Sequence, residues 1–289
     1  MILPFSRLLD TAQQHGFAVG AFNIYNLEGV LAVVRAAETL ESPVILQVLP
    51  SALAIGGRPF LALCRSAAQQ SAVPMAVHLD HCPDAGKIRA ALDAGVSSVM
   101  ADGSGLPFAE NCRFTADMAA LAKRAGADVE GELGFLAGTE DGESVNLSRA
   151  ALTRPDQATE FVRATGVAAV AVCIGNRHGH YPEPPQLDFP RLADIRDQVD
   201  IPLVLHGTSG LPDRDIQQAI SLGVCKFNVN TEVRTAYTRQ LRTMVCRPEG
   251  PPELVRIMSG SIEAMQAPVE SKIQLFGSAG TAVLYTPNP

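Results

Sequence analysis

The sequence predicts an α/β protein that folds as a single-domain (β/α)8 TIM barrel, and two features of its 289 residues carry this prediction. Eight short apolar segments each precede a segment with helical spacing, which is the order that parallel strands joined by crossover helices require. These apolar segments are too hydrophobic to be half exposed, so helices must cover them. An open doubly wound sheet is the alternative, but no G-x-G-x-x-G follows the first strand, which counts against a dinucleotide-binding fold.

The predicted strands are short runs dominated by Val, Leu, Ile and Ala. They cover residues 18–22, 44–48, 75–81, 97–101, 128–132, 168–173, 202–206 and 224–229. The predicted helices cover residues 28–40, 59–70, 84–94, 108–125, 155–164, 189–198 and 213–222, and helices interrupted at 248–252 continue to the C-terminus.

Between the fifth strand and the next helix, residues 134–145 are rich in glycine and acidic residues. They are too polar for the core, which predicts a mobile loop. No shift in composition marks an internal boundary. We therefore expect one catalytic domain over residues 1–289, with a C-terminal helical extension from about 250 to 289.

Composition excludes several classes of protein. Apolar residues make up 47% of the chain and aromatic residues only 5%, so aliphatic side chains must build the core. The net charge is −7 and no Lys/Arg run occurs, which argues against nucleic-acid binding. No signal peptide or membrane-spanning run is apparent. The six cysteines are scattered without a C-x-x-C pair, as expected for reduced thiols in a cytoplasmic protein.

Polar side chains stand where the predicted strands end, and a barrel brings these ends together around one mouth. They are Asn23, Asp80, His81, Asp102, Glu132, His178, His206, Asn228 and Asn230. Three of them are histidines, and three imidazoles with an open fourth position are typical of a catalytic zinc site. Of the other histidines, His15 lies at a predicted helix end, His180 follows a glycine, and His78 is a core histidine or a support for a ligand.

Five motifs together carry a resemblance to a known family. They are H-x-D-H at 78–81, G-E-L-G at 131–134, I-G-N-R-H-G at 174–179, L-H-G-x-S-G at 205–210 and K-x-N-V-N-T at 226–231. In this order and spacing they resemble the class II, metal-dependent fructose-/tagatose-bisphosphate aldolases. The resemblance extends from Gly20 to the stretch at 276–280.

The resemblance implies that His81, His178 and His206 hold one Zn²⁺ per subunit, and that the metal binds dihydroxyacetone phosphate as a Lewis acid. It implies that Asp80 exchanges the proton of the C4 hydroxyl. The alternative for Asp80 is a carboxylate that only orients a histidine.

The resemblance gives further acidic residues a role. Asp102 and Glu132 position the metal or form a secondary cation site, with a hydrogen-bonded structural pair as the alternative. Glu140 is the proton carrier of a mobile loop, unless that loop is merely solvated. A Na⁺ or K⁺ ion near Gly179 and a homodimer or homotetramer are also implied.

Loops that follow the seventh and eighth strands of a barrel commonly bind phosphate, and there a helix N-terminus favours an anion. By resemblance the phosphate contacts are Gly179, Gly207, Ser209, Asn230 and Thr231, while Asn228 holds the dihydroxyacetone portion and Asn23 also contacts substrate. The alternative for Gly-x-Ser-Gly is an ordinary turn.

The sequence also departs from the family pattern. Leu49 stands where a hydroxyl residue is usual, Asn230 replaces an aspartate, and no basic residue follows 276–281. A missing cation should weaken binding of a distal phosphate, although Arg58, Arg177 or Arg234 could substitute. We therefore expect an aldehyde partner other than glyceraldehyde 3-phosphate, and the alternative is a different sugar phosphate of the same length. The competing functions are a barrel zinc hydrolase and a non-catalytic sugar-phosphate binder.

Overall fold

The computed structural model describes residues 1–140, 143–145, 151–179, 181, 183–248, 250 and 252–286, and for 139–140 and 143–145 it describes the backbone alone. Parallel strands form a closed barrel in the order β1-β11-β10-β8-β5-β4-β3-β2. The predicted (β/α)8 TIM barrel is confirmed. Its strands are β1 Val19–Asn23, β2 Val44–Val48, β3 Met75–Cys82, β4 Ser98–Ala101, β5 Asp128–Leu133, β8 Ala169–Val172, β10 Leu203–Leu205 and β11 Val224–Val229.

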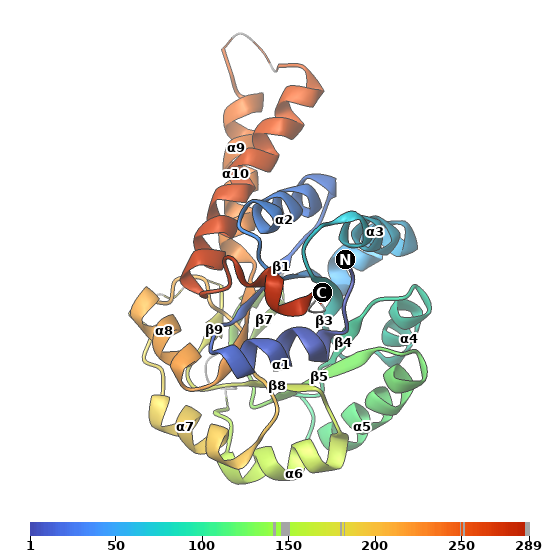
Figure 1. Cartoon of the computed structure of the whole chain (residues 1–289), viewed down its shortest axis with the longest axis vertical. Coiled ribbons are helices and arrows are strands. Elements are labelled where there is room, and N and C mark those ends of the chain that lie inside the picture. The colour runs from blue at the N-terminus through green and yellow to red at the C-terminus, as the bar shows by residue number, and fades with distance from the viewer. Residues whose placement is uncertain are drawn as a thin grey trace.

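Helices surround the barrel (Figure 1). They are α1 Phe5–His15, α2 Leu27–Thr39, α3 Pro50–Gln70, α4 Ala85–Asp93, α5 Phe108–Arg124, α6 Pro155–Thr165, α7 Phe189–Gln198, α8 Asp213–Ser221, α9 Thr231–Val245 and α10 Leu254–Leu275, followed by a 3₁₀ turn at Thr281–Tyr285. Helix α3 begins nine residues before the predicted start at Pro59. Gly57, at φ 56° and ψ −158°, breaks it into two parts.

The sequence prediction lacked helix α1, which lies across one end of the barrel (Figure 1). Its buried residues Phe5, Leu8, Leu9 and Ala12 follow helical spacing. They pack against inward-facing residues of the strands, such as Ala76 of β3. Farther along the strands the barrel interior becomes polar, because buried residues such as Gln47 and His78 line it. The apolar plug at one end therefore leaves the other end for a polar site.

The predicted mobile loop at 134–145 contains regular structure. Strand β6 (Ala137–Glu140) pairs with β7 (Glu143–Val145) and with β9 (Arg177–His178). Gly138 permits the close pairing, since a Cβ there would lie 2.1 Å from the His178 carbonyl oxygen. Polar composition wrongly indicated that the whole segment lies outside the core, because Leu136 and Ala137 are buried. It gave no information on the backbone hydrogen bonds that form the small sheet.

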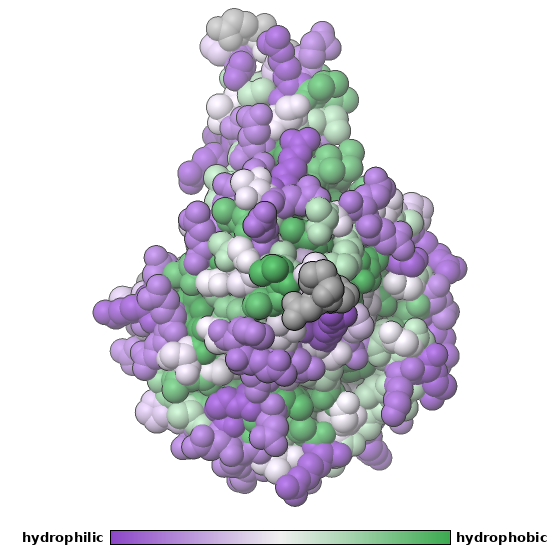
Figure 2. Space-filling model, in the orientation of Figure 1, coloured by the Kyte–Doolittle hydropathy of each residue, from purple (hydrophilic) through white to green (hydrophobic). Residues whose placement is uncertain are grey.

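Helices α9 and α10 project from the barrel as a pair, and α10 also packs against α2 (Figure 1). The surface of this projection mixes hydrophilic and hydrophobic residues (Figure 2). Val245, Leu254 and Val255 lie near the junction of the two helices with exposed fractions of 45%, 68% and 72%. Among the described residues, no helix is long and apolar enough to cross a membrane.

Candidate active site

Asp80, near the end of β3, is a fully buried carboxylate held by side-chain amides of neighbouring strands. Asn23 on β1 donates to Oδ2 at 2.9 Å, and Gln47 on β2 donates to the same oxygen at 3.3 Å. Asn228 on β11 donates to Oδ1 at 3.1 Å. Both carboxylate oxygens are therefore held in one orientation at the polar end of the barrel.

Three histidine rings converge beside Asp80, as the sequence predicted. The ring centroid of His81 lies 4.5 Å from that of His206 and 4.9 Å from that of His178, while His178 and His206 are 6.1 Å apart. His81 adopts φ 41°, a left-handed backbone conformation that is rare for residues other than glycine. Such strain is often retained at functional sites.

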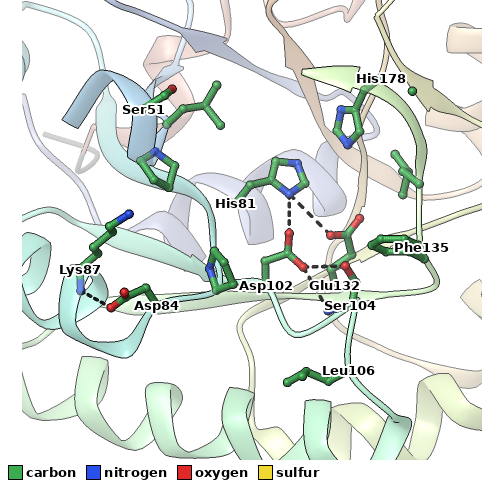
Figure 3. Close-up of a pocket in the computed structure, with 16 residues that line it drawn as sticks. Ser51, His81, Asp84, Lys87, Asp102, Ser104, Leu106, Glu132, Phe135 and His178 are labelled. Carbon is green, nitrogen blue, oxygen red and sulfur yellow. Dashed lines mark hydrogen bonds and ion pairs between the residues drawn. The ribbon is translucent and has the colours of Figure 1, made fainter. Parts of the chain in front are cut away.

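Asp102 and Glu132 both face the Nδ1 atom of His81. The Asp102 carboxylate lies 2.9 Å from this nitrogen and the Glu132 carboxylate 3.6 Å from it (Figure 3). Asp102 also accepts a hydrogen bond from the Ser104 hydroxyl at 2.6 Å. The structure thus brings together the two acidic residues that the sequence placed at the mouth, on the side of His81 away from His206.

A buried charged pair orients His206 from the opposite side. Glu130 Oε1 lies 2.8 Å from His206 Nε2, and Lys226 Nζ lies 2.9 Å from Glu130 Oε2. Lys226 also donates to Asn228 Oδ1 at 2.6 Å. This contact fixes the Asn228 amide so that its nitrogen faces Asp80 and His206. Glu130 and Lys226 were not predicted from the sequence, although Glu130 shares the strand periodicity of Glu132 and Lys226 begins the K-x-N motif.

The donor atoms of this cluster suit a divalent cation. His81 Nδ1 faces a carboxylate and His206 Nε2 faces another, so both ring N–H groups are used there. His206 Nδ1 accepts from the Asn228 amide at 2.9 Å. His81 Nε2 and His206 Nδ1 lie 2.7 Å apart. Two imidazole nitrogens this close together could ligate one ion, and carboxylates behind ligating imidazoles are usual.

The electrostatics of the cluster also favour a cation. Burial lowers the pKa of His81, but the charge of Asp80 and the hydrogen bond to Asp102 outweigh it and raise that pKa well above its usual value. Burial and the charge of His81 lower the pKa of His206. Burial and the neighbouring Asp102 raise the pKa of Glu132. Among the described residues, Asp80, His81 and His206 form one potential metal group and His81, Asp102 and Glu132 another.

The predicted phosphate residues lie on loops beside this cluster. Thr231 begins α9, and the preceding Asn230 accepts a hydrogen bond from the Tyr25 hydroxyl at 2.9 Å. Ser209 and Thr231 line the same cavity, of about 480 Å³. Gly207 and Gly179 both adopt positive φ, at 68° and 78°. The structure thus places small residues and a helix N-terminus where the sequence predicted an anion site.

A substitution at Gly207 tests how strongly the conformation of the loop after β10 is constrained. A Cβ at this position would lie 2.0 Å from the Arg177 carbonyl oxygen. Gly207→Ala is therefore expected to lower the free energy of unfolding by about 2 kcal/mol or more. Gly16→Ala is the control, because Gly16 has a similar φ of 72° with open space around it and should cost about 1 kcal/mol. Equal losses in urea denaturation would contradict the argument.

The remaining sequence candidates lie behind this cluster or away from it. His78 is buried, with Nδ1 2.8 Å from the Ser98 hydroxyl and Nε2 3.8 Å from Glu130 Oε2, and its ring stacks on Phe5. His15 is exposed at the end of α1. The Glu140 side chain and the whole of His180 lie outside the described residues.

Comparisons with known proteins agree with this geometry. Residues 4–281 match the family model described as Fructose-bisphosphate aldolase class-II. A candidate fructose-1,6-bisphosphate aldolase from Coccidioides immitis is 36% identical, with a TM-score of 0.91 over 96% of this chain and 97% of that chain. The YdjI aldolase from Escherichia coli K12 is 34% identical, with a TM-score of 0.85 over 98% and 100%. A fructose-bisphosphate aldolase from Campylobacter jejuni, 22% identical over 96% of both chains, shares the fold with a TM-score of 0.77.

Proposed function

This chain belongs to the class II fructose-bisphosphate aldolase family, and on that premise we propose that it reversibly cleaves a ketose 1-phosphate or ketose bisphosphate to dihydroxyacetone phosphate and an aldehyde. The family makes the protein a carbon–carbon lyase acting on sugar phosphates. The observation that carries the specific proposal is the buried Asp80 carboxylate, held by three amide groups beside the converging histidines.

In this proposal His81, His178 and His206 hold Zn²⁺, with Asp102 and Glu132 on the outer side of His81. Zn²⁺ held by these residues would supply a Lewis acid for the substrate carbonyl. The 2.7 Å approach of His81 Nε2 to His206 Nδ1, with the His178 ring 4.9 Å from that of His81, supports this ligand set.

Asp80 removes the proton of the C4 hydroxyl. As the C4 carbonyl forms, the C3–C4 bond breaks and its electron pair passes to C3 and the adjoining carbonyl group. Return of a proton to C3, which we assign to Glu140, gives dihydroxyacetone phosphate. The amides of Asn23, Gln47 and Asn228 keep the Asp80 oxygens in place throughout, as general-base catalysis requires.

The substrate phosphate is assigned to the loops after β10 and β11. Small residues there leave space for an oxyanion, and backbone N–H groups at the start of α9 favour negative charge. The contacts in this proposal are Gly179, Gly207, Ser209, Asn230 and Thr231, with Asn228 on the dihydroxyacetone portion and Asn23 also at the substrate.

Metal removal tests the proposal. Dihydroxyacetone phosphate release is measured from a panel of ketose 1-phosphates and bisphosphates before and after EDTA treatment, and again after zinc is restored. We expect EDTA to abolish release and zinc to restore it. Release that resists EDTA, in protein shown to be metal-free, would reject metal dependence. Inorganic phosphate as the product would favour the hydrolase, and bound zinc without turnover would favour the binding protein.

A further inference from the structure

The barrel order places the proposed phosphate loops opposite a second region of the mouth. In the closed order β1-β11-β10-β8-β5-β4-β3-β2, strand β11 is diametrically opposite β4, and β10 is opposite β3. All of the predicted phosphate residues except Gly179, which follows β9, come after β10 and β11, and Asp80 lies on β3. A ketose whose phosphate sits at the first pair of strands therefore extends across the histidines toward the loops that follow β3 and β4.

A cavity of about 510 Å³ lies in that region. It reaches the histidine cluster at His81 and His178 and continues outward over the ends of β2 to β5 (Figure 3). Its position makes it the space for the part of the substrate that leaves as the aldehyde. The side chains of this cavity therefore determine which aldehydes the enzyme accepts.

The outer wall of the cavity is largely apolar, formed by Leu49, Pro50, Pro83, Leu106, Phe135 and Leu136. Asp84, Asp102 and Glu132 also line it and contribute carboxylates. Lys87 is the one lysine or arginine among the described lining residues, and it is exposed on α4. The Asp84 carboxylate stands beside it and accepts the backbone N–H groups of Gly86 and Lys87 at 2.7 and 3.0 Å.

The three arginines that could have supplied a cation do not line this cavity. Arg58 on α3 is exposed, and its guanidinium donates to the Asp93 carbonyl oxygen at 3.2 Å. Arg177 belongs to β9, beside the Gly207 loop, and Arg234 lies in α9.

We propose that the aldehyde substrate carries no phosphate at its distal end, so that the enzyme acts on ketose 1-phosphates in preference to ketose bisphosphates. This inference rests on the proposed aldolase function. A phosphate dianion in this cavity would lose hydration against apolar walls without gaining charge-assisted hydrogen bonds. It would also be repelled by the Asp84 and Asp102 carboxylates. An unphosphorylated hydroxyaldehyde avoids both costs.

The test is aldol addition in the zinc-loaded enzyme, with dihydroxyacetone phosphate and either racemic glyceraldehyde or racemic glyceraldehyde 3-phosphate. We expect kcat/KM for glyceraldehyde to be at least about tenfold higher. Equal use of the two aldehydes, or preference for the phosphorylated one, would overturn the inference and leave the aldolase proposal intact. Failure to consume dihydroxyacetone phosphate with either aldehyde, together with no cleavage of the ketose panel, would reject the aldolase proposal itself.

Three substitutions, one of them a control, sharpen this test. Leu106→Arg places a cation in the cavity wall and should shift the ratio of kcat/KM values at least about tenfold toward glyceraldehyde 3-phosphate, with the KM for dihydroxyacetone phosphate unchanged. Leu152→Arg is the matched control, because Leu106 and Leu152 are 45% and 44% exposed and only Leu106 lines the cavity. Lys87→Ala should leave the ratio within about threefold of the wild-type value. A tenfold loss of glyceraldehyde 3-phosphate use in Lys87→Ala would overturn the inference, since Lys87 would then bind a distal phosphate.

Discussion

Replacing Asp80 by asparagine is expected to lower kcat for carbon–carbon cleavage by about 10²- to 10⁴-fold, the range for loss of a general acid or base. Asparagine has nearly the same shape but cannot take the proton of the C4 hydroxyl. The side chain is fully buried and held by three amides, so water cannot easily replace it. The measurements are kcat and KM for a cleaved ketose phosphate and the zinc content of the purified variant.

Zinc content separates the two roles considered for Asp80. A proton-transfer role predicts full zinc content with low kcat, whereas a carboxylate that only orients a histidine predicts loss of zinc. Asp93→Asn at the exposed end of α4 is the control, and it should change neither quantity. An Asp80→Asn variant that keeps more than about a tenth of wild-type kcat would contradict the assignment.

Replacing Lys226 by methionine is expected to lower the free energy of unfolding by about 3–5 kcal/mol, because it leaves the Glu130 carboxylate buried without its counter-charge. Both side chains have an exposed fraction of 0%, and Nζ lies 2.9 Å from Oε2. Methionine keeps most of the side-chain length. Urea denaturation of the wild type and variant provides the measurement.

Two further variants show whether the loss comes from the unpaired charge. Lys226→Met combined with Glu130→Gln should recover part of the stability, since the buried charge is then gone. Arg154→Met removes one partner of the Arg154–Asp156 pair, in which both side chains are 64% exposed. It should cost less than about 1 kcal/mol. A loss below 1 kcal/mol for Lys226→Met would contradict the proposed role of the pair.

Much of the barrel was predictable because its strands are buried on both faces. The runs at 44–48 and 224–229 are strands with the predicted bounds. Helix α1 was missed although Phe5, Leu8, Leu9 and Ala12 carry helical spacing. Apolar residues at helical spacing mark a helix with one buried face, so helix α1 could have been predicted from the sequence.

The small sheet at β6, β7 and β9 was a different case. Its segment looked like a loop because its side chains are polar. The sheet depends on backbone pairing between Gly138 and His178, which are 40 positions apart in the chain. Side-chain composition does not report backbone pairing of this kind.

The sequence by itself determined which residue types stand at the ends of the strands, and hence that His81, His178 and His206 would meet at one mouth. Only the tertiary structure decided their partners. Asn228 reaches Asp80 across 148 positions, and Glu130 reaches His206 across 76. Strand periodicity fixes the face on which a side chain points. The closure and register of the barrel decide which side chains contact each other and how deeply they are buried. Closure and register alone place inward-facing side chains of different strands at the same height along the barrel axis.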